Sequence, residues 1–309
     1  MNKRSNRVLT GLISAVCLIG MVGGLTGCNK AEKNISVVVR EQGSGTREAF
    51  DKVVTDGKHF LEEKNSSGKK VYNTTKDSIQ QTKTGNVLSS VANDKNSIGY
   101  ISLGSVNDTI KVLKVDGVEA TKENVLNGNY KIQRPFVVMT NEKAKLTARA
   151  QDFINYVYSN KSEAFATDAG TIFLTDKDKR GYEVGEYKQL STLPTGDKIV
   201  VRGSTSMEKF INSAAKAYAD MYGAKAEEIF DIQLEGSSVG RKAVENDTTG
   251  NVIGLSSAEV KQDGIKSLNV CLDAVVVIVN NDNKDVTDLS INQLYDIFSG
   301  KIKKFSEIK

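Results

Sequence analysis

The sequence predicts an α/β protein, because apolar strand-like runs and amphipathic helical segments alternate along the 309-residue chain. Three segments carry this prediction, and each reads as a strand, then a turn of Gly with Ser or Thr, then a helix. They are ISVVVREQGSGTREAF at 35–50, KIVVRGSTSMEKF at 198–210 and FDIQLEGSSVGRKAV at 230–244. Strands that alternate with helices favour largely parallel pairing.

The remaining elements follow from periodicity and turn signals. After the strand at 35–39 we expect a helix over 46–61, with His59 on its surface, and further helices over 84–92, 147–159 and 289–301. Strands are predicted at 97–104, 112–118, 134–140 and 273–280, and the second of these turns at Asp116-Gly117. The polar segment 176–197, which contains Pro194, is expected to be a linker.

The first 28 residues are typical of a secretory signal. Lys3, Arg4 and Arg7 precede a mostly apolar run from Val8 to Leu25, and no acidic residue occurs before Cys28. The closing LTGC resembles a lipobox, which predicts cleavage and lipid attachment at Cys28. An ordinary signal peptide or a short membrane anchor are the alternatives. The small residues before Cys28 and the polar run NKAEKN after it favour the lipoprotein, anchored on the outer face of the cytoplasmic membrane.

Charge and cysteine content exclude several classes of function. Loss of the signal lowers the formal net charge from +4 to +1, which leaves no basic footprint for nucleic acid. Besides Cys17 and Cys28 the chain has only Cys271, in an apolar context that predicts a small buried side chain. With one histidine, a Cys/His metal site is not expected, and no cofactor is predicted.

Glycine- and hydroxyl-rich turns at the ends of several strands predict a binding site for an anion. Ligands of α/β sheets bind where strands end and helices begin, and helix amino ends with converging backbone N–H groups favour anions. Helix capping is the common use of Ser and Thr, but several such turns, two of them with arginine nearby, favour one converging site. Arg40 and Arg47 are candidate forked donors. A small tetrahedral oxyanion is expected, and phosphate fits.

The segments REQGSGTREAF, SIGYISLG, GSTSM, EGSSVG, IGLSS and LYDIFSGKIKKFSEI resemble the PstS family of periplasmic-type binding proteins, the phosphate-binding lipoproteins of bacterial ABC importers. The resemblance implies a two-lobed, type II-like periplasmic-binding-protein fold with an interlobe cleft and two hinge strands, near 130–133 and 277–281. It also implies capture of inorganic phosphate for an ABC phosphate permease and its ATPase, by a monomer without enzymatic activity.

The order of these segments differs from that of the family, in which GSTS precedes GSSxG and SGKI, and GSGTR follows them. We interpret the chain as a circular permutant, which is tolerated where the old ends lie close together. One lobe would then be continuous, at 132–278, with the linker 176–197 joining the old ends. The other would be split between 34–131 and 279–309.

The resemblance also implies the phosphate ligands. Arg40, Ser44, Gly45 and Thr46 match the family pattern on the split lobe, and Thr205 and Ser237 match on the continuous lobe. Ser204, Ser206 and Ser238 are near alternatives. Ser257 stands where some members carry an aspartate that accepts a proton from phosphate. The resemblance therefore predicts weaker discrimination against sulfate than an aspartate-bearing site would give, unless Glu41 or Glu235 replaces that aspartate.

Two other classes of function are weighed against this one. GSSVG matches a nucleophile elbow, but that triad order needs a histidine downstream, and His59 lies upstream. Ser206–Lys209, Ser290–Asn292 and Lys83–Gly85 match short penicillin-binding motifs, which chance also supplies in such a chain. A lipid-anchored anion sensor or adhesin without a transport role is the third possibility.

Overall fold

The structure is a computed structural model that describes residues 32–308, and residues from Lys33 onward form one compact unit. The predicted signal segment and Cys28 lie outside the described residues. In the described part, no helix has both the length and the apolar character that are needed to cross a bilayer.

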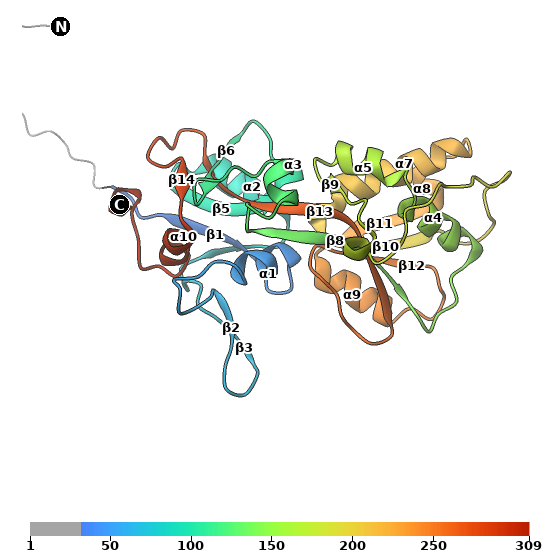
Figure 1. Ribbon diagram of the computed structural model, residues 1–309, viewed down its shortest axis with the longest axis horizontal. Coiled ribbons are helices and arrows are strands. Elements are labelled where there is room, and N and C mark those ends of the chain that lie inside the picture. The colour runs from blue at the N-terminus through green and yellow to red at the C-terminus, as the bar shows by residue number, and fades with distance from the viewer. Residues whose placement is uncertain (1–31, 309) are drawn as a thin grey trace, which may run out of the picture. The chain divides into compact units, whose positions relative to one another are not determined.

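Strands and helices are interspersed along the chain (Figure 1), but they do not alternate strictly, because β2 to β4 and β12 to β14 follow one another with no helix between them. The strands are β1 (Ser36–Arg40), β2 (Glu62–Lys64), β3 (Lys70–Tyr72), β4 (Ile79–Gln81), β5 (Ser97–Ser102), β6 (Ile110–Val112), β7 (Lys114–Val115), β8 (Gln133–Asn141), β9 (Ile172–Phe173), β10 (Ile199–Gly203), β11 (Phe230–Leu234), β12 (Val252–Ser256), β13 (Ile265–Asn280) and β14 (Asp288–Leu289). The helices are α1 (Gly45–Asp51), α2 (Thr84–Asn93), α3 (Lys122–Leu126), α4 (Ala148–Tyr158), α5 (Ser162–Asp168), α6 (Lys177–Arg180), α7 (Glu208–Met221), α8 (Ala226–Ile229), α9 (Ser237–Glu245) and α10 (Ile291–Phe298), and a 3₁₀ turn spans Thr205–Met207.

The main sheet is mixed rather than largely parallel. Its strands follow the order β11-β10-β12-β8-β13-β5-β1-β4, with β6 and β9 also paired to β13. The pairs at the two ends, β10 with β11 and β12, and β1 with β4 and β5, are parallel. The central strand β13 is antiparallel to β8 and β5, and β8 is antiparallel to β12. The strand–helix periodicity therefore predicted the ends of the sheet correctly and its centre wrongly.

The strand β13 contributes residues to two hydrophobic cores. Its residues from Ala274 to Val279 belong to the first core, whereas Val270 and Cys271 belong to the second. Where the chain enters β8 the same change occurs, between Ile132 just before the strand and Phe136 on it. The change of core at β8 is close to the expected hinge at 130–133. The change of core on β13 precedes the expected hinge at 277–281, because residues 275–279 pair with β5 as regular sheet. The division into lobes at 131/132 and 278/279 stays a prediction.

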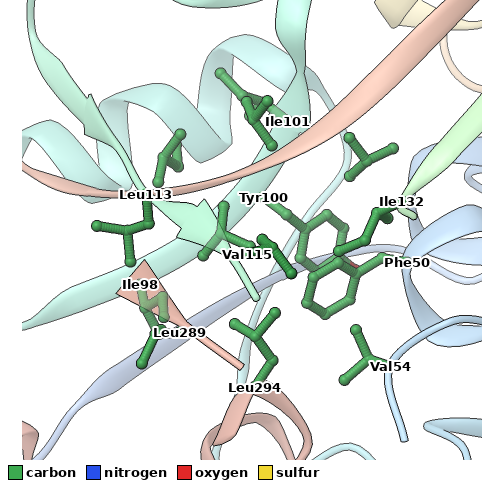
Figure 2. Packing of buried hydrophobic residues seen from close by; sticks show 14 of the residues in the cluster. Phe50, Val54, Ile98, Tyr100, Ile101, Leu113, Val115, Ile132, Leu289 and Leu294 are labelled. Atoms are coloured by element: carbon green, nitrogen blue, oxygen red, sulfur yellow. The ribbon is translucent and has the colours of Figure 1, made fainter. Parts of the chain in front are cut away.

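The first core joins the beginning of the described chain to its end. Phe50 stacks on Tyr100 with ring centroids 4.1 Å apart, and Leu289 and Leu294 come from the last part of the chain (Figure 2). The Ile35 N–H donates to the Lys303 carbonyl at 2.7 Å. The strand β1 and the helix α10 therefore pack in one core. Circular permutation itself stays a prediction.

The predicted helix over 46–61 is wrong beyond its first turns. The helix α1 ends at Asp51, and a turn follows in which Asp56 accepts hydrogen bonds from the N–H groups of Lys58 and His59. Local side-chain acceptors of this kind compete with helix continuation. His59 is exposed, as expected, but on a loop. Cys271 is buried, as predicted.

Candidate anion-binding site

The first predicted turn connects β1 to α1 and is buried. The strand ends at Arg40, and Ser44 caps the helix by accepting from the Arg47 N–H at 3.5 Å. Gly43 has a φ of 89°, a conformation that glycine adopts without strain. Because Arg40, Ser44 and Thr46 are each at most 2% exposed, the polar groups of this turn face the interior of the protein.

The turns that follow β10, β11 and β12 supply the other hydroxyl groups. Ser204 Oγ accepts from the Ser206 N–H at 3.3 Å at the start of the 3₁₀ turn. Ser237 opens α9, directly after Gly236, which has a φ of 134°. Ser257 follows the end of β12 and is fully buried. All three turns lie at the carboxyl ends of parallel strands, where the sheet rule expects ligands.

The first turn meets these later turns in one buried polar cluster. Thr46 Oγ1 and Ser206 Oγ lie 3.0 Å apart, and the Ser238 N–H donates to the Gly43 carbonyl at 3.2 Å. A Cβ atom on Gly45 would lie 2.6 Å from the carbonyl carbon of Ser257, so only glycine permits this approach. The structure thus brings together residues that are about 160 positions apart in the sequence.

Arg40 is tied to both sides of this cluster. Its Nε and Nη2 atoms donate to the two carboxylate oxygens of Glu41, at 3.0 and 2.9 Å. Its Nη1 atom donates to Thr84 Oγ1 at 3.3 Å, and Thr84 Oγ1 lies 3.1 Å from Thr205 Oγ1. The sequence reasoning missed Thr84. Its only signal was its place at the start of a helix, which many Thr residues share.

Arg47 points away from the cluster. Its guanidinium donates to Asp51 Oδ2 at 2.9 Å and to the Arg40 carbonyl at 2.9 Å, and it lies over the Tyr72 ring. Desolvation raises the pKa of the Asp51 carboxyl to about 6, although Arg47 opposes that shift. Arg47 therefore stabilises the first turn by bonding the Arg40 carbonyl at the end of β1 to Asp51 at the end of α1. Its proposed use as a forked donor for an anion was wrong.

Another buried arginine, which the sequence analysis did not nominate, lies beside Ser257. Arg134 on β8 donates to Asp273 Oδ2 on β13 through Nε and Nη2, at 3.0 and 2.9 Å. Its Nη1 atom donates to Ser257 Oγ at 3.1 Å, and Ser102 Oγ donates to Asp273 Oδ1 at 2.8 Å. A charge inside an otherwise apolar strand, in RPFVVM and in LDAVVV, was the available signal.

Burial acts on both members of this ion pair. It lowers the pKa of Arg134, a shift that Asp273 opposes and that the nearby Arg40 charge reinforces. It raises the pKa of the Asp273 carboxyl, against the effect of Arg134. The positive charges of Arg40 and Arg134 thus disfavour one another, and a bound anion would relieve that repulsion.

A cavity of about 440 Å³ adjoins the cluster at Thr205. Its lining also includes Lys83, Asn86, Glu208, Asn212 and Glu235. A larger cavity of about 750 Å³ touches none of the predicted residues, because it lies at the opposite ends of β10 and β11, beside Lys198 and Phe230. The smaller cavity reaches the predicted hydroxyl groups only at Thr205. We therefore place the candidate site in the buried cluster beside it, where the hydroxyl groups and the Arg40 guanidinium lie. Within residues 32–308 no group of His, Cys, Asp and Glu side chains suits a metal ion.

Known proteins resemble this chain over most of its length. The family model for the PBP superfamily domain matches residues 15–161 and 189–307. Phosphate-binding protein PstS 2 of Streptococcus pneumoniae serotype 4 is 37% identical over 304 residues, which cover 94% of this chain and 96% of the relative. Phosphate-binding protein PstS 2 of Streptococcus agalactiae serotype V is 33% identical over 309 residues, with 97% and 98% covered.

A solved structure is similar as well. The crystal structure of a phosphate ABC transporter, phosphate-binding protein from Streptococcus pneumoniae TIGR4 matches with a TM-score of 0.64 and 36% identity. The match covers 89% of this chain and 100% of that one. With the mixed α/β fold and the family match, these likenesses establish that the chain belongs to the PBP superfamily and, within it, to the PstS family of phosphate-binding proteins.

Proposed function

We propose that this protein captures inorganic phosphate in the buried cluster around Arg40 and delivers it to an ABC phosphate importer. One observation carries the proposal. Hydroxyl groups from opposite parts of the chain, Thr46 with Ser206 and Thr84 with Thr205, meet beside a buried guanidinium. Converging donors of this kind suit a tetrahedral anion rich in acceptor oxygens.

Each predicted residue has a role in this proposal. Arg40 supplies the positive charge through the part of its guanidinium that faces Thr84, while Glu41 holds the rest of the group in place. The amino end of α1 contributes backbone N–H groups at Gly45 and Thr46. The hydroxyl donors are Ser44, Thr46, Ser204, Thr205, Ser206, Ser237, Ser238 and Ser257. Thr84 joins this set because its hydroxyl lies beside Thr205, whereas Arg134 contacts one member of the set, Ser257.

The proposal includes a location and partners. A lipid on Cys28 would hold the protein on the outer face of the cytoplasmic membrane. There, as a monomer, it would hand phosphate to a permease and its ATPase. The relatives named above are binding proteins, and we propose likewise that this chain is not an enzyme. Two contacts support this: Ser206 Oγ faces Thr46, and Lys209 Nζ of the penicillin-binding-like motif donates to the Gly104 carbonyl at 2.6 Å.

Calorimetric titration of the mature chain with phosphate, sulfate and arsenate tests the proposal. We expect saturable phosphate binding with one site per chain. The variant Thr46→Val, which removes the hydroxyl that faces Ser206, should bind phosphate more weakly by about 1–3 kcal/mol. The exposed Ser66→Ala serves as the matched control and should bind like the wild type. Absence of binding for all three anions would refute the function.

A further inference from the structure

The hydroxyl group of Ser257 lies at the centre of a chain of hydrogen bonds with a fixed direction. Arg134 Nη1 donates to Ser257 Oγ at 3.1 Å, and Ser204 Oγ donates to the same atom at 2.8 Å. A serine hydroxyl has two acceptor lone pairs and one proton, and a guanidinium can only donate. Both lone pairs of Ser257 Oγ are therefore occupied, and its proton is left to donate.

The next hydroxyl along this chain belongs to Ser237. Its Oγ lies 3.3 Å from Ser257 Oγ and accepts from the Ser257 N–H at 3.1 Å. If the Ser257 proton points to Ser237, the proton of Ser237 is in turn free to donate at the amino end of α9. In either arrangement, the hydroxyl of Ser257 or Ser237 that faces the ligand has a proton to donate to a ligand oxygen.

We propose that Arg134 is a specificity-determining positioning residue: it commits the Ser257 and Ser237 hydroxyls to donation, so that the site selects ligand oxygens that carry no proton. The inference rests on the proposed function and adds the form of the anion that is bound. Phosphate would bind with unprotonated oxygens toward Ser257 and Ser237, so that the dianion, which keeps one proton on an oxygen turned away from them, is preferred over the monoanion, which carries two. Sulfate, whose oxygens carry no proton, would not be rejected at Ser257.

The charged and titratable groups around these hydroxyls come from both sides of the cluster. Arg134 and Asp273 lie on the crossing strands, and Arg40, Glu41 and Tyr100 lie on the side of the first turn. Any of them could change the affinity for every anion as the pH changes. The ratio of the phosphate affinity to the sulfate affinity removes this common effect. What remains is the protonation of phosphate itself, because phosphate gains its second proton near neutral pH whereas sulfate stays deprotonated.

The first experiment compares phosphate and sulfate binding to the wild-type mature chain by calorimetry. Between about pH 8 and about pH 5.5 we expect the affinity for phosphate to fall at least about tenfold relative to that for sulfate, since the bound form becomes a small fraction of the total. A constant ratio, or one that shifts toward phosphate on acidification, would overturn the inference and leave the function intact. Binding of neither anion would instead refute the proposed function.

Two substitutions of similar size sharpen this test. Ser257→Asp adds an acceptor beside Arg134 and should weaken sulfate binding at least about tenfold more than phosphate binding, and should abolish the pH trend of the ratio. Ser257→Asn can accept from Arg134 and still donate through its amide, so it should keep the trend. Equal behaviour of the two variants would contradict the assigned role of the hydroxyl.

The role of Arg134 needs its own variant. The double change Arg134→Gln with Asp273→Asn replaces the ion pair by two neutral amides, which avoids a stranded buried charge. Glutamine can accept as well as donate, so the direction of the hydrogen bonds is no longer fixed. We expect the pH trend of the affinity ratio to weaken in a variant whose unfolding remains cooperative. An unchanged trend in that folded variant would overturn the role of Arg134.

Discussion

Two arginines of the site are paired with carboxylates in opposite ways. Arg40 is paired with the next residue in the sequence, Glu41, whose side chain is 18% exposed. Arg134 is paired with Asp273, which is 139 positions away, and the two side chains are 2% and 0% exposed. The first pair is local and lies at the rim of the cluster. The second is remote and fully enclosed.

The difference in exposure between the two carboxylates indicates different roles for the two ion pairs. Glu41 can turn toward water when an anion approaches Arg40, because its carboxylate is already partly solvated. Asp273 has no such option, since a buried carboxylate without its partner keeps the full desolvation penalty. We therefore expect the Arg40 pair to respond to ligand, and the Arg134 pair to hold the crossing strands and Ser257 in place.

The stability of the two pairs provides the largest predicted contrast. Asp273→Ala strands the Arg134 charge in the interior and should lower the free energy of unfolding by about 3–5 kcal/mol. Glu41→Ala removes a partly solvated carboxylate and leaves the buried Arg40 with the Thr82 carbonyl and Thr84 as partners, so it should cost less, about 1–3 kcal/mol. Urea denaturation of the ligand-free chain measures both. Equal losses of unfolding free energy in the two variants would contradict the assignment of a structural role to the Arg134 pair alone.

Ligand binding should reverse this ranking at Arg40. Arg40→Ala removes charge-assisted hydrogen bonds to a desolvated anion and should weaken phosphate binding by about 2–5 kcal/mol, with a smaller effect on the unfolding of the ligand-free chain. Arg149→Ala is the control, since Arg149 contacts the carbonyls of Pro194 and Asp197, outside the cluster, and the change should leave affinity unchanged. Unchanged phosphate binding by Arg40→Ala would remove Arg40 from the site.

The third ion pair, Arg47 with Asp51, sharpens the comparison through pH. Because the pKa of Asp51 is raised to about 6 in the folded chain, the folded state binds a proton more tightly than the unfolded state does. This contribution to stability is present at low pH and is lost as the pH rises from about 4 to about 6, by at most about 3 kcal/mol. Asp51→Asn should remove that slope from urea midpoints taken across this range. A slope that persists in the variant would have another origin.

The smallest predicted effect lies where the first turn touches Ser257. Gly45→Ala would place a methyl group 2.6 Å from the backbone of Ser257, which should force the two sides apart and weaken anion binding by about 1–3 kcal/mol. Gly185→Ala is the matched control, because its Cβ would meet nothing within 4 Å. If the two variants bind phosphate equally well, the close approach at Gly45 does not matter for the site.

Many helices, strands and turns of this structure can be predicted from short segments of the sequence. The run ISVVV followed by GSGTREAF specifies a buried strand, a glycine turn and a helix start, and the structure has β1, Gly43 and α1 there. Thr147 and Ser159 flank α4 as the periodicity predicts. These features depend on neighbours within a few residues, such as N-cap side chains and alternating apolar positions, so a single segment contains the information.

Other features depend on contacts between distant segments. The sequence alone gave no reason to make β13 antiparallel to both β5 and β8, since strand direction depends on which partners the chain finds. Arg134 was overlooked because its partners, Asp273 and Ser257, lie more than a hundred positions away. Arg47 was misassigned because Asp51, one helical turn further on, competes for its guanidinium.

The sequence by itself determined the alternation of elements, the hydroxyl- and glycine-rich turns and the resemblance that named the family. Each of these depends on residue types at short spacing. Only the tertiary structure decided which of those turns meet, which arginine faces the cluster and in which direction its hydrogen bonds run. The physical reason is that burial and pairing of charge depend on distances such as the 3.1 Å from Arg134 Nη1 to Ser257 Oγ, and these exist only once the remote strands have packed together.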